Sequence, residues 1–367
     1  PTPGAGIRPA GMGGPEPPPP APVAPEDLPG PVARAAEATR MRWKRRRLLY
    51  RARRKRGELT AVTPWRPVAP GAVLCLATMR NEAPRLPHWL AHHRRLGVDR
   101  FLIVDNARDD GTAERLAAEP DVALWSTSAS YRAARFGVDW LGALARAHAA
   151  GHWTLTLDAD ELLIYPHWEE RPLAALTTEL DRRGQPALGA LMVELYPSGR
   201  LSATPCAPGE DPVQALPYFD DGPYRARRQR PARNLWVQGG PRARVFFRDD
   251  PRRAPTLNKL PLVKWRAGHA YLNSCHALLP PRLNLAWDGP GDPRLSGALL
   301  HTKFLHTIVA RSAHPTHRRE HFGEPARFAA YHDALAADPV LWHAGASRFE
   351  GWRQLEALGL LSSGGWT

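Results

Sequence analysis

The chain has 367 residues, of which 43% are hydrophobic, and this is enough for one large or two ordinary domains with a real core. Its formal net charge is +14, but residues 40–57 alone hold 11 Lys or Arg and no acid, so the rest of the chain carries only +3. A protein that reads nucleic-acid phosphates spreads basic residues over its folded docking face. We therefore expect no specific nucleic-acid partner.

The N-terminal part is predicted to consist of two pieces. Residues 1–39 are predicted to be a disordered Pro-rich arm, because Pro1–Gly30 holds 11 of the 39 prolines and almost no aliphatic periodicity. Residues 40–57 are predicted to be a basic helical leader, for which two interpretations stay open. Residues 40–56 contact an anionic membrane surface, or the leader is a helix that packs on the body through its apolar side chains, Trp43, Leu48, Leu49 and Tyr50.

The expected location follows from what the chain lacks and from its cysteines. No stretch approaches the roughly 20 uninterrupted apolar residues of a membrane-spanning helix, and the start has no signal-peptide pattern. Cys75, Cys206 and Cys275 are few, odd in number and each beside apolar residues, as is typical of reduced core cysteines. We expect a cytoplasmic protein, peripheral at the inner face of the membrane if the leader binds lipid.

The body alternates between short apolar runs and amphipathic segments. Apolar runs predict strands, and residues spaced by three and four, such as Leu86, Trp89 and Leu90, predict helices. This order indicates an α/β protein with a Rossmann-related, open, mostly parallel sheet and helices on both faces. The predicted strands are 72–77, 101–104, 122–125 and 153–157, and the predicted helices are 85–96, 112–118 and 137–150.

Polar side chains follow three of these predicted strands, at the point where each strand ends. They lie in Thr78–Glu82, Asp105–Asp110 and Asp158–Glu161. Open α/β sheets bind their ligands at the carboxyl ends of the strands. The sequence therefore predicts that these three segments form one site.

The acids in "DADE" suggest a metal site. Asp158 and Asp160, separated by one residue, can converge on one Mg²⁺ or Mn²⁺ that keeps positions free for phosphate oxygens. The chain has no Gly-x-x-x-x-Gly-Lys-Ser/Thr loop, and no Gly-x-Gly-x-x-Gly follows the first predicted strand, so neither common phosphate-binding loop is supported. A bare Asp-x-Asp is more often a turn or a capping pair, so the pattern needs its context.

The context resembles a known family. "MRNEAPRLPHWLAHHRRLGVDRFLIVDNARDDGT", "SYRAARFGVDWL" and "GHWTLTLDADELLIYP" are similar to family 2 glycosyltransferases, in particular the bacterial branch with Asn-Glu after the first strand and Asp-x-Asp-Glu after the fourth. The resemblance continues through "GGPRARVFF", "KLPLVKW" and "ALLHTKF". It implies a GT-A glycosyltransferase domain at 58–345 and a C-terminal tail at 346–367.

The resemblance also implies an activity. A sugar would pass from a nucleoside diphosphate sugar to a hydroxyl of a carbohydrate or lipid-linked acceptor, with inversion and with Mn²⁺ or Mg²⁺, as in bacterial surface polysaccharide or glycoconjugate synthesis. The main alternatives are a metal-dependent nucleotidyltransferase and a non-catalytic membrane-surface binding module. "TMRNEAP" lacks the Gly-rich loop of the former, and the intact acids speak against the latter.

The implied donor site has several members, each with a simpler structural explanation. Glu82 could instead interact with the N-terminus of the next helix, and Arg132 and Arg135 clamp the diphosphate or pair with nearby acids. His301 competes with His276 as a further metal ligand, and Glu161 would orient the motif. The resemblance places Asn81, Glu82, Asp105 and Asp158 at the nucleotide, and Asp158 and Asp160 at the metal. To these, the residue types add Arg132 and Arg135 as candidates for the nucleotide and His301 as a candidate for the metal.

The catalytic base stays open among three carboxylates. Inverting transfer needs a carboxylate that accepts the proton of the acceptor hydroxyl. Glu194 ends an apolar run at the predicted sheet edge, and Asp220 and Asp221 lie in "YFDDGPY", a loop able to cover an acceptor.

Overall fold

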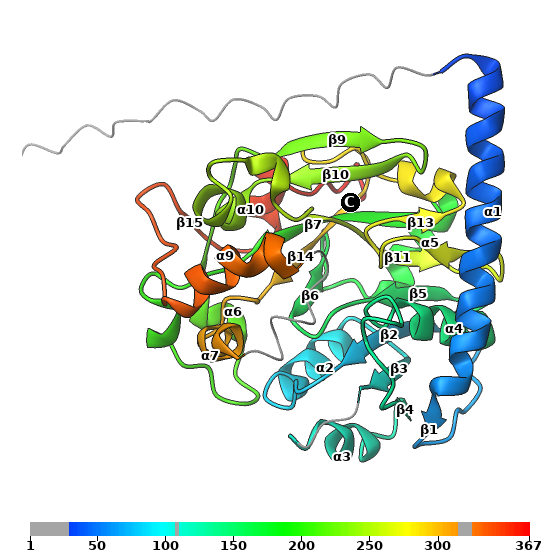
Figure 1. Ribbon diagram of the computed structural model, residues 1–367, viewed down its shortest axis with the longest axis horizontal. Coiled ribbons are helices and arrows are strands. Elements are labelled where there is room, and N and C mark those ends of the chain that lie inside the picture. The colour runs from blue at the N-terminus through cyan, green and yellow to red at the C-terminus, as the bar shows by residue number, and fades with distance from the viewer. Residues whose placement is uncertain (1–28, 107–109, 315–324) are drawn as a thin grey trace, which may run out of the picture.

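The computed structural model describes residues 29–106, 110–314 and 325–367 (Figure 1). Most of the predicted disordered arm, residues 1–28, lies outside the described residues. Within the described part, none of the helices combines the length and the apolar character needed to cross a bilayer.

A nine-stranded sheet forms the centre, in the order β1-β4-β3-β2-β5-β11-β7-β14-β6. The pairings orient β4, β3, β2, β5, β7 and β14 in one direction, while β1, β11 and β6 run the opposite way. The sheet is therefore open, mixed and mostly parallel. Its strands are β1 Thr60–Ala61, β2 Val73–Met79, β3 Arg100–Asp105, β4 Val122–Ser126, β5 Trp153–Thr156, β6 Glu161–Ile164, β7 Ala187–Glu194, β11 Asn258–Lys264 and β14 Gly297–His301.

Helices cover both faces of the sheet, because successive side chains of a strand point to opposite faces. On β2, Val73 and Cys75 belong to the core that contains residues of α2, α3 and α5, whereas Leu74 and Leu76 belong to the core that contains α4. The predicted α/β fold with helices on both faces is confirmed. These helices are α2 Leu86–Arg95, α3 Thr112–Ala117, α4 Val138–His148 and α5 Leu173–Arg182.

The second half of the chain adds small elements around the carboxyl ends of the strands. A β9–β10 hairpin and the short pairs β12–β13 and β8–β15 lie outside the large sheet. Their bounds are β8 Tyr218–Phe219, β9 Arg225–Gln229, β10 Asn234–Gln238, β12 Ala270–Tyr271, β13 Leu278–Leu279 and β15 Ser347–Arg348; the helices are α6 Pro212–Ala215, a π-helix at Arg242–Phe246, α7 Thr307–Ala313, α9 Pro325–Ala336 and α10 Trp352–Ala357.

The predicted C-terminal tail is part of the body, which corrects the boundary at residue 346. β15 pairs with β8, and Trp352 and Leu355 of α10 are buried in the same core as β2 and β7. The physical reason is the spacing of three between these two apolar residues, which gives even a six-residue helix an apolar side to bury.

The basic leader is a single helix that begins earlier than predicted. α1 spans Pro31–Lys55, so residues 31–39 of the predicted arm are helical, and Pro31 occupies the helical start where its missing N–H costs nothing. The helix buries Met41, Leu48 and Ala52 rather than Trp43 and Tyr50.

Polar contacts hold α1 to α4 along one edge of the molecule (Figure 1). Arg51 of α1 donates to Asp139 of α4 at 2.8 Å, and the Trp140 indole N–H of α4 donates to Glu58, in the 3-10 turn that follows α1, at 2.9 Å. Because the Asp139 side chain is only 1% exposed, its pair with Arg51 fixes the helix more firmly than an exposed ion pair would.

Candidate active site

A cavity of about 990 Å³ opens at the carboxyl ends of β2, β5 and β14. Of the described residues, twelve Lys or Arg but only three carboxylates line it. A cavity with this excess of positive charge suits an anionic substrate. The sequence-predicted residues in its lining are Glu82, Arg132, Arg135, Asp158, Asp160 and His301.

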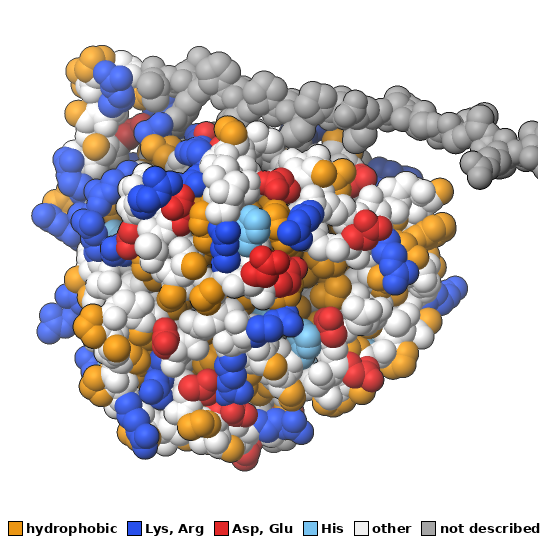
Figure 2. Space-filling view, turned by 180° about the vertical axis from the view of Figure 1, so that it is seen from behind, with side chains coloured by type: hydrophobic (Ala, Val, Ile, Leu, Met, Phe, Trp, Pro, Cys, Tyr) orange, Lys and Arg blue, Asp and Glu red, His pale blue; other side chains and the backbone are white. Residues whose placement is uncertain are grey.

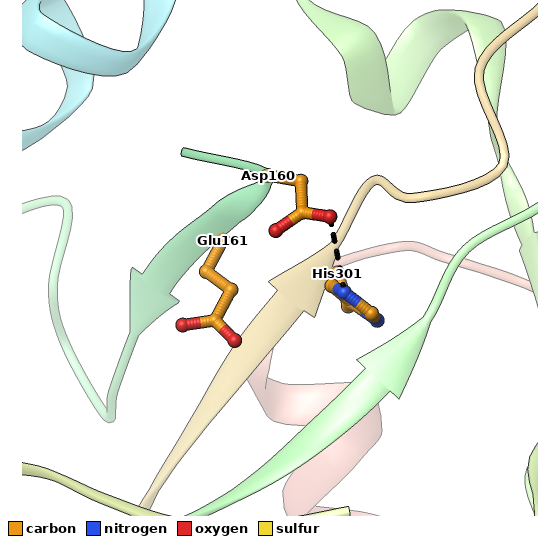
Figure 3. Close-up of side chains that lie close together, drawn as sticks. All are labelled: Asp160, Glu161 and His301. Atoms are coloured by element: carbon orange, nitrogen blue, oxygen red, sulfur yellow. Dashed lines mark ion pairs between the residues drawn. The ribbon is translucent and has the colours of Figure 1, made fainter. Parts of the chain in front are cut away.

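Asp160 and His301 meet at the floor of the cavity. Figure 3 shows the two side chains pointing toward each other, with Asp160 Oδ2 and His301 Nε2 3.3 Å apart. The backbone enforces this contact, because Thr302 donates its N–H to the Asp160 carbonyl at 2.8 Å. Burial opposes ionisation of Asp160, but His301 outweighs it, and the pKa of Asp160 lies well below its usual value.

Glu161 lies beside the Asp160–His301 pair. It is the first residue of β6 and lies opposite His301 in the β6–β14 register. One ligand atom from each of Asp160, Glu161 and His301 lies within 4.8 Å of the other two. The three side chains can therefore converge on one metal ion, although Asp158, which the resemblance placed at the metal, is not in this group.

A buried lysine explains the position of Asp158. The Lys259 side chain is 1% exposed, and its Nζ lies 2.7 Å from Asp158 Oδ2 and 2.5 Å from Glu161 Oε1. Burial raises the pKa of Glu161 to about 7, and Lys259 opposes this rise. Lys259 was not predicted as a site residue, yet "KLPLVKW" carried a signal, since a lysine within an apolar strand needs a buried acid as partner.

Glu194, one of the three candidate catalytic bases, is buried behind His301. Its side chain is 0% exposed, and Oε1 lies 2.5 Å from Arg242 Nε and 3.3 Å from His301 Nδ1. Burial would raise the pKa of Glu194, but Arg242 and His301 hold it below the usual value. A carboxylate on the far ring nitrogen of a histidine orients that ring. Glu194 is placed to orient His301.

Asp220 and Asp221, the other two candidate bases, are not part of the cavity lining. Asp220 accepts from Arg244 Nε at 2.8 Å and from the Tyr196 hydroxyl, and it is buried. Asp221 accepts from Ser347 Oγ at 2.8 Å. The loop that holds them packs against β15, because β15 pairs with β8 directly before it.

Glu82, a candidate nucleotide contact, is held between two arginines. Arg311 Nη2 lies 3.0 Å from Glu82 Oε1, and Arg85 Nε lies 3.2 Å from Oε2. Burial raises the pKa of Glu82, and both arginines oppose that rise. Asn81 has a positive φ of 56° and, like the buried Asp105, is not part of the cavity lining.

The two arginines of "SYRAARFG" have different surroundings. Arg135 pairs with Asp139 at 3.1 Å and donates to the carbonyls of Tyr271 and Leu272, which is the pairing alternative rather than a free clamp. Arg132 is exposed at the cavity and makes no ion pair with the parts of the chain that the structure describes. Of these two arginines, Arg132 is therefore the one that the described residues leave without a carboxylate partner.

Two further basic residues, His276 and Lys303, line the cavity. His276, the alternative metal ligand, bonds the Asn258 carbonyl through Nδ1 at 2.6 Å, and burial lowers its pKa to about 3. Lys303, two residues after His301, lines the cavity, and burial lowers its pKa although Asp160 opposes this. Lys303 was not predicted, although it stands in "ALLHTKF" beside the histidine that was.

No family model matches the chain. Over 102 residues, 25% of this chain, it is 32% identical to a glycosyltransferase family 92 protein of Oryza sativa subsp. japonica and 33% identical to one of Arabidopsis thaliana. The chain spans 16% of the length of these curated relatives. These relatives belong to family 92, whereas the resemblance seen in the sequence named family 2.

Solved structures offer weaker likenesses. A mannosyltransferase from Pyrobaculum calidifontis in complex with GDP-Man and Mn²⁺ is 21% identical, with 44% of this chain and 45% of that chain covered and a TM-score of 0.24. A 4-diphosphocytidyl-2C-methyl-D-erythritol synthase is 20% identical, with 34% and 62% covered and a TM-score of 0.23. The description of the fold therefore rests on its strand order, and a quarter of the chain is similar to family 92 glycosyltransferases.

Proposed function

We propose that this protein is a divalent-metal-dependent glycosyltransferase that moves a sugar from a nucleoside diphosphate sugar to a hydroxyl acceptor. The observation that carries the proposal is the Asp160–His301 pair at the strand ends, inside a cavity rich in positive charge. The similarity to family 92 proteins supports the class of reaction.

The donor atoms at the floor fit a metal ion such as Mn²⁺ or Mg²⁺. Carboxylate oxygens with one imidazole nitrogen suit Mn²⁺, and Glu194 on Nδ1 leaves His301 Nε2 directed toward Asp160. Asp160 and His301 would hold the ion, with Glu161 within reach and Asp158 beside it. When bound, the ion neutralises the diphosphate that leaves the sugar.

The chain's own cations complete the diphosphate site. Lys303 lines the cavity next to the metal ligands, and Arg132 lines it from the loop before α4. A guanidinium group can bind phosphate oxygens bidentately, whereas an ammonium group acts as a point charge. Arg132 would fix the orientation of the diphosphate, and Lys303 would stabilise its growing negative charge.

Inversion at the anomeric carbon stays a prediction from the resemblance. In the part of the chain that the structure describes, the carboxylates of the cavity are Glu82, Asp158 and Asp160, and each of them has a basic partner. The anomeric configuration of the product, read from the coupling constant of its anomeric proton, decides between inversion and retention.

A donor screen tests the proposed activity. Nucleoside diphosphate sugars are incubated with and without Mn²⁺, and the release of nucleoside diphosphate is measured; a nucleotidyltransferase would instead release pyrophosphate. Asp160→Asn should lower turnover by at least about 100-fold, because it removes the charge of a metal ligand. Asp181→Asn, an exposed acid on α5, is the control. Unchanged turnover and metal dependence in Asp160→Asn would refute the metal site.

A further inference from the structure

Helix α1 carries a second apolar stripe that the body does not cover. Met41, Leu48 and Ala52 face the body and are buried. Val32, Trp43 and Tyr50 are 85%, 65% and 60% exposed.

The exposed stripe lies on the side of α1 opposite the buried one. Val32 and Trp43 are 11 residues apart, and Trp43 and Tyr50 are seven apart, close to whole numbers of 3.6-residue turns, so the three lie in one line. Met41 lies about 160° away from Trp43 around the helix, at about 100° per residue. The helix therefore has one apolar line toward the protein and one toward solvent.

Arginines flank the exposed line. Arg46, Arg47 and Arg54 are exposed, and the Arg46 guanidinium lies over the Trp43 ring, 5.5 Å from its centroid. Residues 40–57 contain no acid that could neutralise them. Figure 2 shows Lys and Arg side chains gathered along the edge of the molecule that α1 forms.

We propose that this face of α1, defined by Val32, Trp43, Tyr50 and the three flanking arginines, docks on a membrane surface of anionic lipids. Trp and Tyr side chains favour the boundary between headgroups and acyl chains, and the arginines meet the lipid phosphates. The stripe is straight, sparse and edged by cations, which suits a flat anionic surface. A protein interface concentrates its apolar residues in a central patch instead.

The cavity opens beside this face. Arg40, Met41 and Lys44 of α1 line the cavity, and Arg40 and Lys44 lie between the buried and the exposed lines, about 60° and 100° from Trp43. A bilayer against the exposed line would therefore lie next to the cavity. We infer that the acceptor is a lipid-linked saccharide; this step rests on the proposed glycosyl transfer, whereas docking itself does not.

Vesicle sedimentation of the full chain tests the docking. We expect binding to phosphatidylcholine vesicles that contain phosphatidylglycerol, loss of binding at high salt, and little binding to phosphatidylcholine alone. Equal sedimentation with both kinds of vesicle, or with neither, would overturn the proposal. Displacement from the vesicles by single-stranded RNA at equal phosphate concentration would also overturn it and identify a nucleic-acid surface.

Two surface variants assign the binding to the face itself. Trp43→Ala with Tyr50→Ala should weaken vesicle binding by about tenfold or more, because both rings leave the interface. The matched control is Trp342→Ala, an exposed tryptophan far along the chain. Equal loss in both proteins, or none in the double variant, contradicts the assignment, and an unchanged melting temperature shows that α1 still packs.

The charge variants follow the same design. The triple variant Arg46→Gln, Arg47→Gln and Arg54→Gln should lose the salt-sensitive part of vesicle binding. Arg182→Gln with Arg252→Gln, which changes exposed arginines elsewhere, should keep it. Turnover on a soluble acceptor should be equal in all these proteins, so loss of docking is distinguishable from failure of the proposed activity.

Discussion

Replacing Glu194 by Gln separates two roles that the same residue could have. As a base, Glu194 would take a proton from the acceptor; as a positioning residue, it holds the His301 ring. The change keeps the size of the side chain and removes its charge. The structure favours the positioning role, because Glu194 is fully buried and Oε1 is shared by Arg242 and His301.

The two roles predict different losses. Outer partners of metal ligands typically contribute a factor of about 10–100 in metal affinity, which is about 1.4–2.8 kcal/mol at 1.4 kcal/mol per tenfold. Loss of a general base typically costs about 10²–10⁴-fold in turnover at any metal concentration. Glu194→Gln should therefore shift the Mn²⁺ concentration for half-maximal activity upward and leave most turnover at saturating Mn²⁺.

Stability must be measured alongside activity, because the variant also breaks a buried ion pair. Breaking such a pair costs about 3–5 kcal/mol when the remaining charge stays buried, and the amide oxygen of Gln offsets part of this by still accepting from Arg242. Asp220→Asn is a matched control, since Asp220 is also buried on an arginine but lies outside the cavity. It should lower the free energy of unfolding without changing the metal dependence.

The result that would refute the reasoning is a folded Glu194→Gln protein whose activity responds to Mn²⁺ like the wild type while turnover falls by about 100-fold or more. That outcome would restore Glu194 as the base and would require the ion pair with Arg242 to open in the complex with substrate.

Two further substitutions test the buried framework. Lys259→Met should cost about 3–5 kcal/mol of unfolding free energy, because Asp158 and Glu161 lose their shared cation. The control is Lys264→Met, a more exposed position on the same strand. Equal melting temperatures of the two variants would contradict the prediction. Leu355→Ala should cost about 2–5 kcal/mol in urea unfolding, since α10 is part of the core; a cost below about 0.5 kcal/mol, as for a surface position, would show that 346–367 is a dispensable tail.

The parallel part of the fold was predictable because its signals are local. The predicted strands 101–104 and 122–125 correspond to Arg100–Asp105 and Val122–Ser126, and the predicted helix 137–150 corresponds to Val138–His148. Apolar periodicity within each segment determines these elements. The insertion of β11 between β5 and β7, against the direction of both, is set by long-range pairing that no local pattern contains.

The sequence could predict the place of a site residue only where that place follows from the end of the strand beside it. Asp160 and His301 meet because both lie at carboxyl ends of the sheet, as the position of their motifs indicated. Glu194 also ends a strand, but it forms a buried ion pair with Arg242, which lies 48 positions later in the chain. The sequence contains Glu194 and Arg242, but it does not show the contact between them on which the role of Glu194 depends.

The three acids of "DADE" differ in role because each has a different neighbour. Lys259 is shared by Asp158 and Glu161, and burial raises the pKa of Glu161 to about 7 although Lys259 opposes this. Asp160 adds a further negative charge, which His301 balances only when protonated. Burial opposes that protonation, but Asp160 and Glu194 outweigh it and raise the pKa of His301. A divalent cation would balance the negative charge of these carboxylates with a neutral imidazole as ligand. This buried negative charge, more than the spacing of the acids, distinguishes the segment from an ordinary acidic turn.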